Sequence, residues 1–141
     1  MIKFEDFIMS DVFIIEEMIG KTFVSVIQRG DDELIFVDAE GNACVFYHDQ
    51  DCCESVTIED IVGDLADLQN SEIVEAECVT DEHPTDYANE VYESYTWTFY
   101  KFRTKKGCVT VKWCGLSNGY YSESVNFKTM TKEELNSLMR I

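Results

Sequence analysis

The pattern of hydrophobic and polar positions predicts a chain built mainly of short strands. Runs of β-branched and aromatic residues that alternate with polar ones are typical of half-buried strands. Seven such runs span residues 22–29, 33–39, 43–48, 71–80, 94–104, 108–114 and 120–129. Glycines in turn-like contexts separate several of these runs, among them Gly30, Gly41 and Gly119. Connections this short predict an antiparallel meander.

One segment follows a helical period instead. Its apolar residues stand at i, i+3, i+4 and i+7 spacing, and they are Ile58, Ile61, Val62, Leu65 and Leu68. Its acids fall on the opposite face, and they are Glu59, Asp60, Asp64 and Asp67. The pattern predicts an amphipathic helix over residues 58–70 that packs on the sheet and turns an acidic back to solvent. Gly63 lowers helix propensity in this segment, so we expect it to have a packing reason.

Helices are also predicted at both ends of the chain. Residues 1–20 contain an apolar stripe of helical spacing that ends on a C-cap glycine. Thr131 and Glu134 have the spacing of a capping box before a short helix. Residues 81–93 contain the only proline and few apolar residues, which predicts a long flexible loop. We therefore expect one α+β domain over residues 1–141, with a meander sheet of six or seven strands, a central amphipathic helix and short terminal helices.

Charge is distributed unevenly along the chain. The formal net charge is −17. Residues 1–93 contain 25 acids and three bases, whereas residues 94–141 contain three acids and eight bases. A field of this sign repels nucleic acid and anionic membranes, so neither is expected as a direct partner. It favours a basic protein partner, or it serves only to keep the protein in solution.

The sequence also bears on the compartment and on assembly. No stretch is long and apolar enough to cross a bilayer, and residues 1–6 carry acids where a targeting signal would be basic. A cytoplasmic location is therefore expected, in which the six cysteines would be reduced. Short meanders with open edges pair readily across a two-fold axis, so a homodimer is compatible with the sequence.

A Cys/His group carries the first candidate chemistry. His48, Cys52 and Cys53 are potential zinc ligands or a thiol–base pair, but no second pair of Cys or His residues completes a tetrad. The acids around them would raise a thiol pKa rather than lower it. We therefore treat these residues as a weak metal candidate, and we expect no cofactor and no catalytic residues.

A basic segment around the turn at 105–107 is the second candidate for a functional site. Its cations could bind phosphate groups, and nearby tyrosines could stack on a base. The residues of this candidate ligand site are Lys101, Arg103, Lys105, Lys106, Tyr120 and Tyr121. The alternative is a solvated hairpin tip, with tyrosines that cover the sheet.

Two longer segments resemble a known family. The first runs from Tyr47 to Leu65 and contains His-Asp-Gln-Asp-Cys-Cys-Glu-Ser-Val, followed by Ile-Glu-Asp-Ile-Val-Gly-Asp-Leu. The second combines residues 94–102, Ser-Tyr-Thr-Trp-Thr-Phe-Tyr-Lys-Phe, with residues 117–125, Ser-Asn-Gly-Tyr-Tyr-Ser-Glu-Ser-Val. Over residues 18–127 the chain resembles an uncharacterised family of short acidic proteins of bacteriophages and prophages, a domain of unknown function.

The resemblance implies a small acidic protein made in an infected bacterium, where many such proteins occupy a host component. With the charge, this predicts a non-enzymatic, anti-CRISPR-like inhibitor of an antiviral defence system. It would present carboxylates to the basic, nucleic-acid-binding surface of a host protein. The expected contact residues are Asp49, Asp51, Glu54, Glu59, Asp60, Asp64 and Asp67. The alternatives are a protein that sequesters a nucleotide immune signal, and a metal-binding or thiol-dependent protein centred on the Cys/His group.

Overall fold

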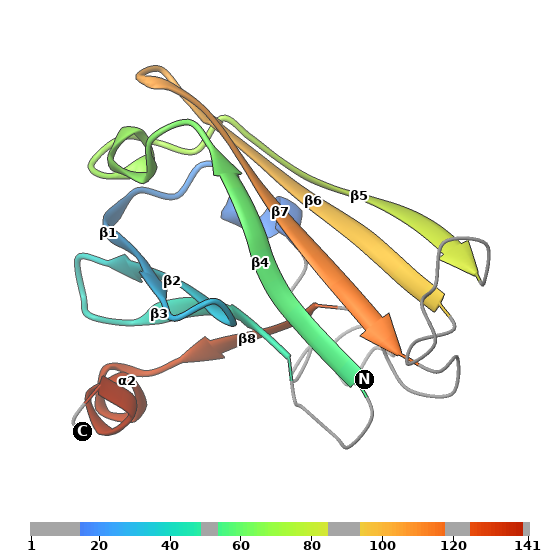
Figure 1. Ribbon diagram of the computed structural model, residues 1–141. Helices are drawn as coiled ribbons and strands as arrows, with labels where there is room; N and C mark the ends of the chain where they lie inside the picture. The colour runs from blue at the N-terminus through green and yellow to red at the C-terminus, as the bar shows by residue number, and fades with distance from the viewer. Residues whose placement is uncertain (1–14, 49–53, 85–93, 118–124, 140–141) are drawn as a thin grey trace, which may run out of the picture.

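Two antiparallel sheets of four strands each form the body of the molecule (Figure 1). The computed structural model describes residues 15–48, 54–84, 94–117 and 125–139. The first sheet has the order β1-β2-β3-β8, with β1 Phe23–Arg29, β2 Glu33–Asp38, β3 Ala43–Tyr47 and β8 Asn126–Met130. The second has the order β4-β7-β6-β5, with β4 Glu54–Val62, β7 Gly107–Ser117, β6 Ser94–Thr104 and β5 Glu75–Pro84. Shorter elements are η1 Ile15–Met18, η2 Leu65–Leu68 and the helix α2 Lys132–Met139.

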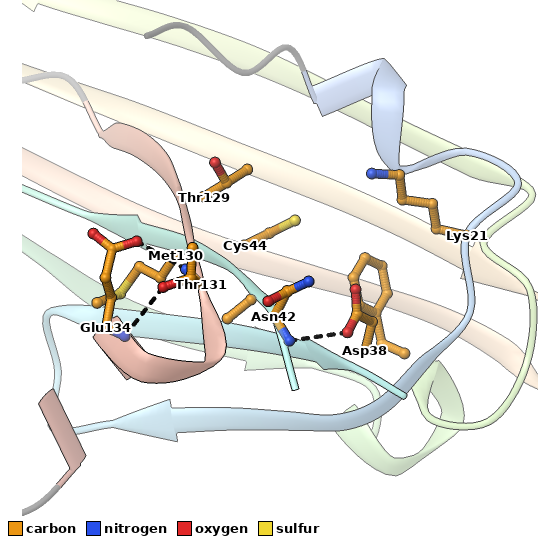
Figure 2. A pocket seen from close by; sticks show the side chains of 10 residues that line it. Lys21, Asp38, Asn42, Cys44, Thr129, Met130, Thr131 and Glu134 are labelled. Carbon is orange, nitrogen blue, oxygen red and sulfur yellow. Dashed lines mark hydrogen bonds between the residues drawn. The ribbon is translucent and has the colours of Figure 1, made fainter. Parts of the chain in front are cut away.

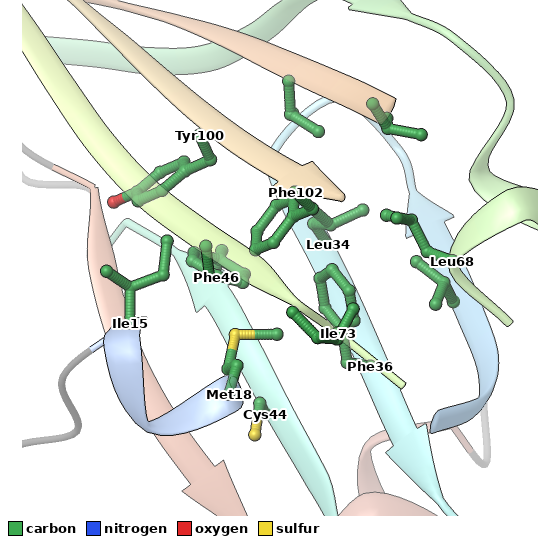
Figure 3. Close-up of a cluster of buried hydrophobic side chains, with 14 of the residues drawn as sticks. Ile15, Met18, Leu34, Phe36, Cys44, Phe46, Leu68, Ile73, Tyr100 and Phe102 are labelled. Atoms are coloured by element: carbon green, nitrogen blue, oxygen red, sulfur yellow. The ribbon is translucent and has the colours of Figure 1, made fainter. Parts of the chain in front are cut away.

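The main hydrophobic core lies between the two sheets (Figure 3). Phe36 and Phe46 of the first sheet meet Phe102 of the second, and the ring centroids of Phe36 and Phe102 are 5.0 Å apart. Met18 of η1 is fully buried and joins this core. Removal of these apolar surfaces from water drives the sheets together.

A second, smaller core lies on the other face of the first sheet. Ile35 and Val45 project there from β2 and β3, and Leu135 of α2 packs against them. The predicted capping box is confirmed, because Thr131 N donates to Glu134 Oε1 at 2.9 Å and Glu134 N donates to Thr131 Oγ1 at 3.2 Å. The described elements thus stack as α2, first sheet, main core and second sheet.

The helix predicted over residues 58–70 is wrong. Its first residues continue β4, in which Val56 and Ile58 are buried on the core face. A register shift between Ile58 and Asp60 inserts a β-bulge, after which Ile61 packs against the core. The bulge changes the period of two into a spacing of three, which imitates helical periodicity. The density of β-branched residues in this segment favours the strand.

The rest of the predicted helix is a turn and a short 3-10 segment. Gly63 has φ +107°, and a Cβ at this position would lie 2.5 Å from the carbonyl oxygen of Cys108. The expected packing reason for this glycine is therefore confirmed. Asp64 then caps η2, where its side chain accepts a hydrogen bond from Ala66 N at 2.9 Å.

The predicted fold is wrong at the level of the whole sheet as well. Among the described residues, the structure has eight strands in two sheets, and its only α-helix is α2. Several predictions of individual strands are confirmed. The range 94–104 is β6, and the first three predicted strands match β1, β2 and β3 within a residue. β5 begins at Glu75, later than predicted, and it includes residues 81–84 of the expected flexible loop. The remainder of that loop, 85–93, lies outside the described residues.

The predicted N-terminal helix can be compared with the structure only over its last residues. Ile15–Met18 form a single 3-10 turn, and residues 1–14 lie outside the described part of the chain. Gly20 has φ +91°, as expected for a glycine that ends a helical segment. Its N–H donates to the carbonyl of Ile73 at 2.8 Å, which ties this end of η1 to the segment before β5.

Candidate functional site

An acidic cluster forms where the first hairpin meets β4. We define this acidic cluster as Asp31, Asp32, Glu59 and Asp60, all of which are exposed. The N–H of Ile58 donates to the carbonyl of Asp31, so the turn between β1 and β2 lies against the bulge in β4. A bulge breaks the alternation of a strand, which lets the consecutive side chains of Glu59 and Asp60 both face solvent.

The carboxylates of the acidic cluster form no ion pair among the described residues, although Asp60 stands opposite Lys112 in the register of β4 on β7. Thr57 Oγ1 donates to Glu59 Oε2 at 2.8 Å, a contact that orients this carboxylate without removing its charge. In the described ranges, no lysine or arginine forms an ion pair with any member of the cluster. By contrast, Glu33 at the start of β2 is held by Arg29 at 3.1 Å. The acidic cluster therefore presents negative charge to solvent.

The other predicted acidic contacts are divided among different positions. Asp64 serves as the cap of η2. Asp67 is half-buried beside the β6–β7 hairpin, and a Cβ added to Gly107 would lie 2.8 Å from Asp67 Oδ2. Glu54 is the first residue of β4. Asp49 and Asp51 lie outside the described residues. Of the seven predicted acids, only Glu59 and Asp60 belong to the acidic cluster.

Sequence reasoning missed Asp31 and Asp32. Both stand in a turn that the sequence does identify, but their position beside Glu59 and Asp60 comes from a contact between two sheets. No local pattern signals such a contact. The one available sign was that acids occur in both segments.

The β6–β7 hairpin, residues 94–117, carries five bases and no acid. Two of its cations pair with β5 across the sheet, since Arg103 Nη2 lies 2.6 Å from Glu75 Oε1 and Lys101 Nζ lies 3.9 Å from Glu77 Oε1. The hydrogen bond from Arg103 lowers the pKa of Glu75. Exposed pairs of this kind contribute little stability and remain exchangeable.

The tip of this hairpin is held by backbone acceptors. Lys106 Nζ donates to the carbonyl of Gln69 at 2.7 Å, and Thr104 Oγ1 donates to the carbonyl of Asp67 at 2.6 Å. Lys105 is exposed and makes no ion pair among the described residues. Tyr120 and Tyr121, the stacking residues of the candidate ligand site, lie outside the described part of the chain.

Aromatic side chains lie on the outer face of β6. Trp97 and Phe99 are half-buried there. Lys112 of β7 places its Nζ 4.2 Å from the centroid of the Trp97 ring and 6.0 Å from that of Phe99. This cation–π contact covers part of the aromatic surface with a side chain of the protein itself.

A shallow pocket of about 320 Å³ opens between β3, β8 and the start of α2 (Figure 2). Cys44 lines it, and burial raises the pKa of this thiol to about 11, against the opposite effect of Lys21. A neutral thiol is a poor nucleophile. The pocket's acids have structural tasks, because Asp38 Oδ1 accepts from Asn42 N at 3.0 Å and Glu134 belongs to the capping box. The pocket offers mixed polar walls and no activated group.

The Cys/His group is described only in part. His48 follows β3 and is buried, while Cys52 and Cys53 lie outside the described residues. Within the described ranges, no three His, Cys, Asp or Glu side chains come together in a way that could hold a metal ion. In the same ranges, no helix is both long and apolar enough to cross a membrane.

Residues 16–127 match a family model described as Domain of unknown function (DUF7448). The chain belongs to this family. The match includes every member of the acidic cluster and the whole β6–β7 hairpin, and it ends within β8, before α2. No curated protein matches the chain. No solved structure matches it either.

Proposed function

We propose that this protein is a non-enzymatic inhibitor that binds the basic, nucleic-acid-binding surface of a bacterial antiviral defence protein. The acidic cluster would make the contact. The observation that carries the proposal is that a backbone hydrogen bond joins two segments distant in sequence, which together carry four exposed carboxylates with no ion-pair partner among the described residues. An origin in a bacteriophage or prophage is part of the proposal, and it rests on the resemblance of the sequence.

The chemistry of the acidic cluster suits such a target. Arginine and lysine side chains that grip phosphates also bind carboxylates, and arginine does so through two parallel hydrogen bonds. The cluster sits on a strand and a tight turn joined by a backbone hydrogen bond, so little conformational entropy is lost on binding. The net charge of −17 would also accelerate encounter with a basic surface.

The test compares two variants with the same change in net charge. In the first, the four carboxylates of the acidic cluster are replaced by amides, as Asp31→Asn, Asp32→Asn, Glu59→Gln and Asp60→Asn. In the matched control, four acids on other elements are replaced, as Glu16→Gln, Glu40→Gln, Glu77→Gln and Glu133→Gln. Each is expressed in bacteria that carry single cloned defence systems, and infection by phage is scored. Purified protein is then tested for competition with nucleic acid for the defence protein that it blocks.

We expect the native protein to restore infection against at least one system and to displace nucleic acid from its target. The cluster variant should lose about tenfold or more in competition, since each close charge pair at an interface contributes more than 1 kcal/mol. The control should compete like the native protein, and higher salt should weaken both. Equal competition by the cluster variant and the native protein would exclude the acidic cluster as the contact. Failure to restore infection in every system tested would contradict the inhibitor function itself.

A further inference from the structure

We infer that residues 1–14 dock on the outer face of the second sheet and cover its aromatic side chains. The docked segment precedes η1 in the chain and lies outside the described residues. The surface that receives it is the face of β4, β7, β6 and β5 that points away from the main core. Neither the segment nor the aromatic residues of this face belong to the acidic cluster, so the inference does not rest on the proposed function.

The outer face of the second sheet carries an apolar patch. Along β6, Tyr100 and Phe102 point into the main core, so Trp97 and Phe99 project from the opposite face. The neighbouring strand extends the patch, because Val79 of β5 stands opposite Phe99 and is 43% exposed. The other apolar residues at outward positions are Tyr95, Leu116 and Val62.

None of the described elements covers this patch. The short elements η1 and η2 supply Met18 and Leu68 to the main core. The helix α2 packs through Leu135 on the first sheet, and in Figure 1 it lies on the side away from the second sheet. Lys112 shields the Trp97 ring only in part. Monomeric proteins rarely leave a contiguous apolar face in water, so another segment or molecule is expected there.

Residues 1–14 provide a second apolar surface that needs a partner. Nine of these 14 residues are apolar, which is too many for a segment that stays in water. The segment precedes the region that matches the family, residues 16–127. The helix α2 follows that region, and it covers the outer face of the first sheet. Residues 1–14 would cover the second sheet in the same way.

The point of attachment favours this face. Residues 1–14 join the fold at η1, which packs against β5, the edge strand of the second sheet. A helix of this length spans about 21 Å, whereas neighbouring strands are only about 4.8 Å apart. Since β6 lies next to β5, the segment reaches Trp97 and Phe99 by passing around a single strand.

The charge favours a segment of the same chain over a second copy of the protein. Two copies that met through this face would bring together two net charges of −17, and the repulsion opposes such a dimer. A segment of the same chain is already present at a high effective concentration, and it loses little translational freedom on docking.

The test uses the full-length protein, in which the two tryptophans serve as probes. Trp97 lies on the outer face, whereas Trp113 is fully buried in the main core and provides an internal reference. NMR detects nuclear Overhauser effects between the Trp97 indole protons and the side chains of residues 1–14, and Trp97→Phe assigns the indole signals. Quenching of fluorescence by acrylamide measures how far Trp97 is exposed.

Two double variants are compared with the native protein. Phe4→Ser with Phe7→Ser should weaken docking about a hundredfold, which is the loss expected for two buried aromatic side chains. The contacts to the Trp97 indole should then disappear and quenching should increase, while the Trp113 signal is unchanged. The matched control, Ile19→Ser with Val24→Ser, removes exposed apolar side chains outside the second sheet and should behave like the native protein.

Sedimentation of the same samples separates the other occupants, and we expect a monomer in every case. A native dimer that Phe4→Ser with Phe7→Ser converts to a monomer would place the segment on a second copy and overturn the inference. Absence of contacts between Trp97 and residues 1–14 in the native monomer, or unchanged quenching in the segment variant, would overturn it as well. None of these outcomes depends on the acidic cluster, so the two proposals can fail separately.

Discussion

Cys44 illustrates how one side chain links burial to the pH dependence of stability. It lies in the main core and is 5% exposed, and burial raises the pKa of its thiol from 9.0 to about 11. A raised folded-state pKa means that the stability from the neutral thiol is complete below about pH 9 and is lost as the pH rises toward 11. In this window the unfolded chain has released a proton that the folded chain retains. The free energy of unfolding should therefore fall with increasing pH.

The difference in slope between native protein and a Cys44→Ala variant measures this effect. Urea unfolding at several pH values between 8 and 11, with a reductant present, should give a slope about 1 kcal/mol per pH unit shallower for the variant near pH 10. Burial also raises the pKa of Tyr100, so some decline remains in both proteins. Identical slopes in native protein and Cys44→Ala would show that the thiol ionises equally in both states.

At the scale of elements, the junction after β4 determines how that strand lies on β7. Gly63 combines φ +107° with a Cβ position 2.5 Å from the carbonyl oxygen of Cys108. Gly20 has a similar φ of +91°, but no atom lies within 4 Å of its Cβ position. The two glycines therefore separate the cost of the backbone conformation from the cost of the steric contact.

Gly20→Ala should lower the free energy of unfolding by about 1 kcal/mol, because alanine disfavours positive φ. Gly63→Ala should lower it by about 2–4 kcal/mol, since β4 and β7 must also move apart. Urea unfolding of both variants alongside the native protein gives the comparison. Equal losses would mean that the backbone around Cys108 shifts freely, contrary to the close register of β4 on β7.

The elements that could be predicted are those whose pattern is local. A period of two over residues 94–104 marks β6, and the Thr131–Glu134 box marks the start of α2. The helix over 58–70 was wrong because a bulge and a 3-10 turn reproduce helical spacing without helical hydrogen bonds. The division of the strands into two sheets depends on contacts between distant segments, which periodicity does not encode.

The candidate sites can likewise be predicted only where their residues follow a local pattern. Glu59 and Asp60 were identifiable as exposed acids, although on a strand and not on a helix. The position of Asp31 and Asp32 beside this segment becomes visible only when the chain is folded. Lys105 was predicted as one of the cations around the hairpin turn that could bind phosphate groups.

At the scale of the whole molecule, folding concentrates a large excess of negative charge. The chain contains 28 acids and 11 bases, and ion pairs are found for only a few of the acids in the described residues. Like charges are closer in the folded state than in the expanded unfolded chain, so their repulsion opposes folding. The acidic cluster is the part of this excess that we propose to be functional, and its charge should therefore carry a measurable cost in stability.

Added salt should relieve that cost. Raising sodium chloride from about 0.01 M to about 0.15 M shortens the screening length from about 30 Å to about 8 Å. The free energy of unfolding in urea should rise by an amount on the order of 1 kcal/mol, because repulsion in the folded state is screened more than the scattered ion pairs are weakened. The variant with the four cluster carboxylates replaced by amides should be more stable at low salt and respond less to added salt. A fall in stability with salt would instead mean that pairs such as Arg103–Glu75 outweigh the repulsion, and that the acidic cluster costs the fold nothing.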